Sequence, residues 1–139
     1  MHTPVFGCVP AGVIWRPRRA AYAVIRDEAG RVATVGHGSR RFLPGGGSHA
    51  QESVAQTLER EVREELGCSL TIREGIGDAV QHFFSSDDEC WYSMEATFVR
   101  GDLTGEVSPS HADEIVWLQQ AEAEAMLYHA CHVWAIREG

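Results

Sequence analysis

The chain has 139 residues, enough for a hydrophobic core, so residues 1–139 are expected to fold as a single domain. Its formal net charge of −8, from 12 basic and 20 acidic residues, argues against nucleic-acid binding through a broad basic surface. No apolar run looks like a signal peptide or could span a bilayer, which favours a cytoplasmic protein without a membrane partner.

The first part of the chain contains short apolar runs separated by turn residues. Residues 20–25 form an apolar run of strand length, residues 27–30 are typical of a turn, and residues 31–35 predict a second strand that pairs with the first as a hairpin. Residues 41–43 predict a short strand that leads into a proline- and glycine-rich loop at 44–47.

A helix is predicted over residues 51–66. Apolar residues recur there at every fourth position and form a stripe that can face a sheet: Val54, Leu58, Val62 and Leu66. Gly67 directly follows the stripe, and glycine at this place commonly ends a helix.

The second half of the chain predicts more strands and a C-terminal helix. The strands are expected at residues 69–73, 77–84, 91–100 and 114–118, with a solvated turn at 85–89 and a polar loop at 101–112. Residues 120–128 predict a helix, which the tail continues or follows with another short helix. Strands on both sides of a central helix, with a further helix at the end, predict an α/β fold with a mixed β-sheet between helices.

Three carboxylates crowd the C-terminal part of the predicted central helix. Glu61, Glu64 and Glu65 have the i, i+3 and i+4 spacing that brings side chains to one helical face, where like charges repel. A solvated acidic face would explain them if they stood alone. Because a glycine loop precedes the helix, and because hard divalent cations prefer oxygen ligands, the pattern favours a Mg²⁺ or Mn²⁺ site that acts on phosphates.

Residues 43–68 resemble the signature sequence of the Nudix hydrolases. The matching positions are Gly46, Glu52, Arg60, Glu61, Glu64, Glu65 and Gly67. Cys68 departs mildly from the pattern, since it replaces an aliphatic residue. The resemblance implies a single Nudix-type α/β/α sandwich domain. It also implies a metal-dependent enzyme that cleaves the diphosphate linkage of a nucleoside diphosphate linked to another group X.

The same resemblance implies roles for individual residues. Glu61, Glu64 and Glu65 would bind the metal, together with the carbonyl oxygen of Gly45. Glu61 and Glu64 would be the key catalytic carboxylates, and Arg60 would orient a neighbouring carboxylate through its planar guanidinium fork. Glu52 is expected only to support the structure of this segment.

Two questions about the reaction stay open at this stage. The general base could be Glu61 or Glu64, or it could come from the loop that contains His111, Asp113 and Glu114. A non-catalytic nucleotide-binding or regulatory module on the same fold is the alternative function, although no signature position is damaged. Related proteins are often dimers, so a homodimer is an expectation from the resemblance alone.

The substrate is not readable from the sequence, and no substrate-binding residue can be assigned. Enzymes that hydrolyse oxidised nucleoside triphosphates are one candidate class, and some of them read the base with an asparagine amide. This chain has no asparagine, so Gln119 or Gln120 would have to replace it. The proline expected in ADP-ribose hydrolases is also missing, because Phe83 and Phe84 occupy that region.

Other polar and aromatic residues have simple structural explanations. Four cysteines far apart in sequence predict reduced, mostly buried thiols: Cys8, Cys68, Cys90 and Cys131. His129 and His132 have no matching pair at zinc-site spacing, which favours core packing or surface exposure over a zinc cluster. The basic cluster of Arg16, Arg18 and Arg19 fits either a phosphate site or a solvated edge. The large aromatic residues are mostly core candidates, of which one or two could stack on a nucleobase: Phe83, Phe84, Trp91, Tyr92 and Trp117.

Overall fold

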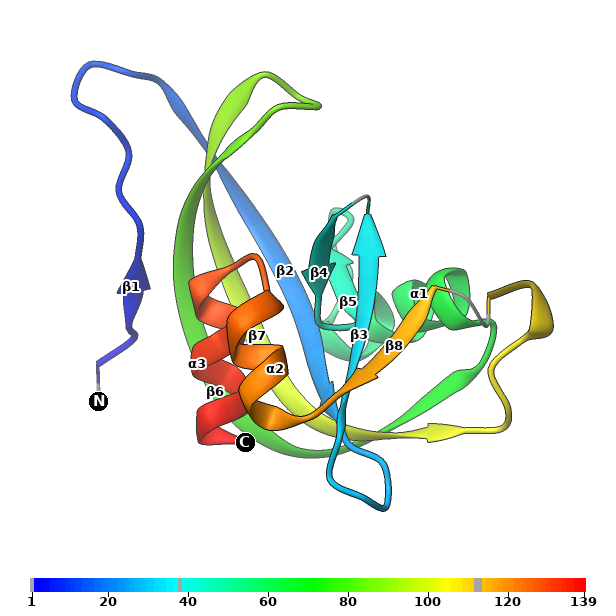
Figure 1. The fold of residues 1–139 in the computed structure, drawn as a ribbon. Coiled ribbons are helices and arrows are strands. Elements are labelled where there is room, and N and C mark those ends of the chain that lie inside the picture. Colours follow the sequence, from blue (N-terminus) through cyan, green and yellow to red (C-terminus); the bar gives the residue numbers. More distant parts are fainter. Residues whose placement is uncertain (1, 38, 112–113) are drawn as a thin grey trace.

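The strands of the computed structural model are divided between two sheets (Figure 1), and the structure describes residues 2–37, 39–111 and 114–139. The larger sheet has the order β1-β6-β7-β2-β5, made of Val5–Phe6, Ser69–Ser85, Cys90–Thr104, Trp15–Ile25 and Gly45–Gly47. The smaller sheet has the order β4-β3-β8, made of Arg40–Phe42, Val32–His37 and Ile115–Leu118. The larger sheet is mixed, since β7 is parallel to β2 and antiparallel to β6.

The larger sheet lies between helices, as the sequence predicts. The helices are α1 (Val54–Leu66), α2 (Gln120–Met126) and α3 (Ala130–Glu138), with a short 3₁₀ turn at Pro109–His111. Alternate residues of β2 face opposite ways, because side chains alternate across a strand. Ala21, Ala23 and Ile25 pack with Leu58 of α1, whereas Ala20, Tyr22 and Val24 pack with the α2 and α3 residues Ala123, Cys131 and Ala135.

The central helix begins three residues later than predicted, at Val54. The backbone of Gln51 is left-handed, with φ 68°, so the helix cannot extend through this residue. Ser53 caps the helix instead: its hydroxyl accepts from the Gln56 amide at 3.1 Å, and the Gln56 side chain accepts from the Ser53 amide at 2.9 Å. The predicted stop is confirmed, since Gly67 has φ 70° and donates to the carbonyl of Arg63.

The predicted hairpin of residues 20–25 and 31–35 is wrong in its pairing. The chain does turn back at 27–30, but only Arg26 and Val32 form a bridge before β3 joins the smaller sheet. The reason is that both edges of β2 are already paired. Strand β7 pairs with the full length of β2 on one edge, and β5 pairs with residues 20–22 on the other edge. A strand has only two edges, so β3 has to pair elsewhere.

Three further boundaries differ from the prediction. The two strands predicted at 69–73 and 77–84 are one strand, β6, with register shifts between Ile72 and Gly77. Strand β7 continues to Thr104, so the polar loop is shorter than residues 101–112. The C-terminal helix ends at Met126, before the predicted residue 128, and the tail forms the separate helix α3, one of the two alternatives that the sequence left open. None of the helices in the described part of the chain is long and apolar enough to cross a membrane.

Residues 45–47 were predicted as a loop but form strand β5 beside β2. A β-carbon on Gly45 would lie 2.1 Å from the carbonyl oxygen of Ala21, and its φ of 138° disfavours any other residue. Glycine therefore allows β5 to approach β2 closely enough to pair. This pairing brings the start of the signature segment against the sheet and beside α1.

Candidate active site

Arg60 connects α1 to β5 and to the segment between them. Its guanidinium donates to both carboxylate oxygens of Glu52, at 2.8 and 3.0 Å, and to the carbonyl of Gly47 at 2.9 Å. It also donates to Glu61 at 2.9 Å. The hydrogen bonds from Arg60 lower the pKa of Glu52 to about 2. The fork geometry predicted for Arg60 is thus present, and Glu52 anchors the arginine that positions Glu61.

Glu61 lies directly against β5. A β-carbon on Gly46 would lie 2.8 Å from the carboxyl carbon of Glu61, so this carboxylate fits only because residue 46 is glycine. The Glu61 side chain is 17% exposed, and its burial raises its pKa although Arg60 acts in the opposite direction. The structure therefore holds a partly desolvated carboxylate in one place, at the edge of the sheet.

Glu65 and Glu64 differ strongly in their surroundings. Glu65 accepts a hydrogen bond from the Gly45 amide at 3.0 Å, and burial, with added repulsion from nearby carboxylates, raises its pKa to about 8. The Glu64 side chain is 58% exposed and lies 3.5 Å from Arg60. Of the three predicted metal ligands, Glu61 and Glu65 are thus partly buried, whereas Glu64 is exposed.

The residues present fit a hard divalent cation by their chemistry. Glu61, Glu64 and Glu65 supply only oxygen donors, and a nearby cation favours the ionised forms that burial disfavours in Glu61 and Glu65. Within the described residues, however, no three acidic, histidine or cysteine side chains are already gathered as ligands. The carboxylates would have to turn to meet at one ion, and the assignment of the Gly45 carbonyl stays a prediction.

The alternative source of a general base lies near the C-terminal end of α1. The Ser108 amide donates to the carbonyl of Leu66 at 3.0 Å, which places the loop beside this helix end. Glu114 is close enough for its charge to help raise the pKa of Glu65. His111 and Glu114 are not among the described residues that line the cavity beside Glu61 and Glu65, and Asp113 lies outside the described residues.

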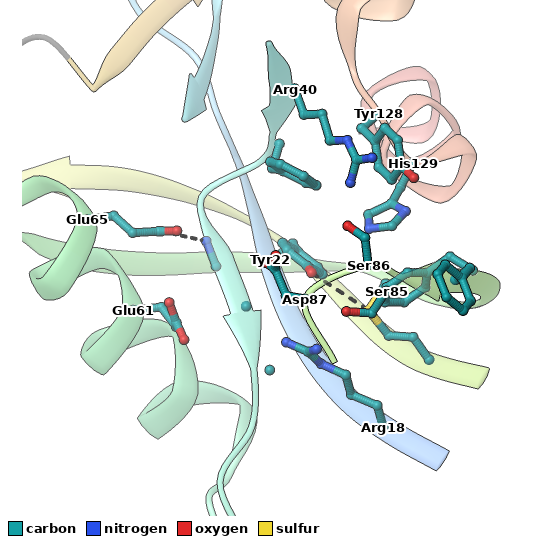
Figure 2. Close-up of a pocket in the computed structure, with 17 residues that line it drawn as sticks. Arg18, Tyr22, Arg40, Glu61, Glu65, Ser85, Ser86, Asp87, Tyr128 and His129 are labelled. Atoms are coloured by element: carbon teal, nitrogen blue, oxygen red, sulfur yellow. Dashed lines mark hydrogen bonds between the residues drawn. The ribbon is translucent and has the colours of Figure 1, made fainter. Parts of the chain in front are cut away.

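A cavity of about 320 Å³ adjoins the carboxylates, within the roughly 300–1,000 Å³ typical of small-molecule sites. One wall consists of strand β5 with Glu61 and Glu65 (Figure 2). The other walls come from elements far apart in sequence, and their main members are Arg18, Tyr22, Arg40, Phe42, Phe83, Tyr128 and His129. Most of these residues lie outside the signature segment, so its pattern could not identify them.

Of the three clustered arginines, only Arg18 lines this cavity. A β-carbon on Gly47 would lie 2.7 Å from its guanidinium, and the ring of Tyr92 lies 5.3 Å away on a neighbouring strand. Arg19 is exposed and donates instead to the carbonyl of Glu52 at 3.4 Å. Arg18 thus lies in the wall of the same cavity as Glu61, whereas Arg16 is exposed.

The aromatic residues expected in the core are not fully buried. Phe83, Trp91, Tyr92 and Trp117 are half-buried and Phe84 is 45% exposed, whereas Phe98 is fully buried and Tyr22 is 5% exposed. Phe83 and Phe84 line the cavity, which leaves them in reach of a ligand. Among the thiols, all of them free, Cys68 and Cys131 are buried as predicted, but Cys8 is exposed.

His129 and His132 pack into the interior, which is one of the two environments that the sequence left open. The Leu43 amide donates to Nδ1 of His132 at 3.1 Å. Burial lowers the pKa of both histidines, that of His129 to about 4, and the charges of Arg18 and Arg40 add to the effect on His129. Both imidazoles are therefore neutral near neutral pH.

Acidification is expected to destabilise the fold through His129. Between pH 6.5 and about 4 the unfolded state binds a proton at this residue and the folded state does not, so the free energy of unfolding falls as the pH falls. The contribution is up to about 3 kcal/mol. Urea unfolding of wild type and His129→Phe at pH 6.5 and pH 4 measures this contribution, because the variant lacks the titration of His129. The titration of Glu65 affects the stability of both proteins in the same way. A difference in stability that does not change with pH would contradict this origin.

Comparison with known proteins assigns the chain to a family. The NUDIX domain matches residues 16–133, which is most of the chain. The chain therefore belongs to the Nudix hydrolase family, with a MutT-like fold, and members of this family are hydrolases that act on acid anhydrides. No curated protein matches the sequence significantly.

Solved structures support the same fold at low sequence identity. A NUDIX hydrolase from Nitrosomonas europaea has a TM-score of 0.66 and 21% identity, with 88% of each chain covered. A MutT protein from Methanosarcina mazei Go1 has a TM-score of 0.64 and 20% identity, over 99% of this chain and 94% of the other. An ADP-ribose pyrophosphatase from Streptococcus suis 89-1591 has a TM-score of 0.61 and 20% identity, over 88% and 91%.

Proposed function

We propose that this protein is a Mg²⁺- or Mn²⁺-dependent hydrolase that cleaves the diphosphate linkage of a nucleoside diphosphate linked to a group X. The observation that carries the proposal is the position of Glu61. Arg60 and Gly46 hold its carboxylate at the wall of a ligand-sized cavity, and Arg18 reaches the same wall. A metal-binding carboxylate beside a cationic side chain suits a substrate that carries several phosphates.

The chain's own residues would divide the work of the reaction. Glu61, Glu64 and Glu65 would hold the cation, which when bound neutralises phosphate oxygens and lowers the pKa of water. Arg60 keeps Glu61 in place, and Arg18 would bind a phosphate through its guanidinium fork. Glu64 is exposed and, among the described residues, its carboxylate pairs with Arg60 at 3.5 Å, so in this proposal it accepts a proton from the attacking water.

The substrate within this class is not fixed by the relatives. One similar structure is that of a MutT protein and another is that of an ADP-ribose pyrophosphatase, at about the same identity to this chain. The two glutamines considered as base-reading residues do not line the cavity: the Gln120 amide donates to Glu124 and to the carbonyl of Ile136. A base would therefore have to be read by another residue.

The test is a release assay for phosphate and pyrophosphate with Mg²⁺ or Mn²⁺. The panel contains canonical and oxidised nucleoside triphosphates, ADP-ribose, diadenosine polyphosphates and nucleotide sugars. We expect turnover of at least one compound. EDTA should abolish this turnover because it removes the divalent cation, and the carboxylates are themselves negative and cannot neutralise the phosphates. Nucleotide binding without turnover under any metal condition would instead favour the non-catalytic module.

A further inference from the structure

The short segment that leads into strand β5 is held from two sides. On one side, the Ala23 amide of β2 donates to the carbonyl of Pro44 at 2.9 Å. On the other side lies the connection between α2 and α3, where the Tyr128 amide donates to the carbonyl of Arg41 at 2.9 Å. Between these two points is Leu43, which is fully buried and belongs to no strand. Its amide therefore needs a partner from elsewhere in the chain.

His132 of α3 supplies this partner. The Leu43 amide donates to Nδ1 of His132 at 3.1 Å, across 89 residues of sequence. The imidazole is fully buried, and burial lowers the pKa of His132 well below its usual value, so the ring is neutral. Only one nitrogen of a neutral imidazole carries a proton, so acceptance at Nδ1 places that proton on Nε2. Among the described residues, Nε2 has no hydrogen-bond partner.

The two nitrogens of His132 are thus unequal. A leucine would fill the same interior place without burying an unpaired N–H group, which costs free energy. The nitrogen that explains the imidazole is therefore Nδ1, which holds the Leu43 amide. The ring is also fixed in place, because the ring centroids of Tyr22 and Phe98 lie 4.2 and 5.8 Å from its own, both edge to face.

A shift of Leu43 would reach the carboxylates through strand β5. Gly45 follows Leu43 by two residues, and its amide donates to Glu65 at 3.0 Å (Figure 2). Gly46 passes Glu61 so closely that an added β-carbon would lie 2.8 Å from the carboxyl carbon. A displacement of about 1 Å at a catalytic group can lower turnover by about 10²-fold. The position of residue 43 therefore bears on the positions of two proposed metal ligands.

We propose that His132 is a positioning residue of the candidate active site. By accepting the hydrogen bond of the Leu43 amide, it holds the start of β5 where Gly45 and Gly46 meet Glu65 and Glu61. The role rests on the proposed function for the identity of these carboxylates as metal ligands. His132 lies outside the signature segment and is not among the described residues that line the cavity, so it acts through the backbone.

The test compares three substitutions by two measurements that need no turnover. His132→Asn keeps an acceptor, because its side-chain oxygen is as many bonds from the backbone as Nδ1. His132→Leu has no acceptor, and His132→Gln places its oxygen one bond further out. Hydrogen exchange of the Leu43 amide should be faster by about tenfold or more in the Leu and Gln variants than in the Asn variant. The dissociation constant of Mn²⁺ should rise about tenfold in the Leu and Gln variants and stay within about threefold of wild type in the Asn variant.

Turnover of the preferred compound in the release assay gives a third readout. His132→Leu should lower kcat by about 10- to 100-fold and change KM by less than about threefold, because the carboxylates and not the substrate contacts are displaced. His132→Asn should keep most of the wild-type kcat, although it removes a ring from the interior and should melt below His132→Leu. Loss of stability alone would give the opposite order of activities.

His82→Leu is the matched control. Nδ1 of His82 is also buried without a partner, but this residue lies on β6 and does not line the cavity. The control should match wild type in Mn²⁺ affinity and in kcat. Wild-type behaviour of His132→Leu, or losses in His132→Asn as large as those in His132→Leu, would overturn the positioning role and leave the hydrolase function standing. If wild type bound no Mn²⁺, the proposed function and this role would both fall.

Discussion

Replacing Glu64 with glutamine is expected to lower kcat by about 10³-fold, within the range for loss of a general base or a charged metal ligand. The substitution keeps the size and shape of the side chain and removes only its charge. Glu64 is 58% exposed and contacts Arg60 at 3.5 Å, so its loss should change stability by less than about 0.5 kcal/mol. The measurement is kcat on the preferred compound of the release assay, together with the melting temperature.

The control for this substitution is Glu59→Gln on the same helix. Glu59 is also exposed and pairs with Arg63 at 3.3 Å, but it is not one of the carboxylates proposed to hold the metal. The Glu59→Gln variant should keep wild-type turnover, which would separate the loss of one particular carboxylate from a general change in charge. Turnover of Glu64→Gln within about tenfold of wild type would mean that the base lies elsewhere, and Glu114→Gln would then be the next variant to measure.

Features that depend on neighbours in sequence could be predicted well. The four-residue spacing from Val54 to Leu66 predicted the buried face of α1, and Leu58, Val62 and Leu66 are indeed fully buried. The glycine at residue 67 predicted the end of that helix. Such signals are local, because a helix is closed by hydrogen bonds four residues apart. The signature spacing belongs to the same class, since Arg60, Glu61 and Glu64 occupy adjacent turns.

Features that depend on distant strands could not be predicted in this way. Three consecutive glycines are typical of a loop, and only the approach of β2, some 25 residues earlier, makes them a strand. The same limit applies to His129, whose ring contacts come from residues 42, 83 and 128. Its sequence context favours core packing or surface exposure over a zinc site. Its position in the wall of the cavity, against rings from three segments, is visible only in three dimensions.

Gly46→Ala is expected to lower kcat/KM by about 10²-fold, the size of effect expected when a catalytic group is displaced by about 1 Å. The added β-carbon would lie 2.8 Å from both the carboxyl carbon and one oxygen of Glu61. The end of a glutamate side chain can move, so the fold should survive while the carboxylate leaves its place and weakens its 2.9 Å hydrogen bond from Arg60. The measurement is kcat/KM, with circular dichroism and melting temperature to confirm that the protein is folded.

The neighbouring glycines make this prediction discriminating, because each one makes room for a different group. Gly45→Ala would place a β-carbon 2.1 Å from the backbone of Ala21 at a φ of 138°, so that variant should lose stability and not only activity. Gly75→Ala is the neutral control, since nothing lies within 4 Å of its added carbon. If Gly46→Ala were as active as wild type, Glu61 could not act from the position where Arg60 holds it, and the catalytic arrangement would have to form by a larger movement of α1 against β5.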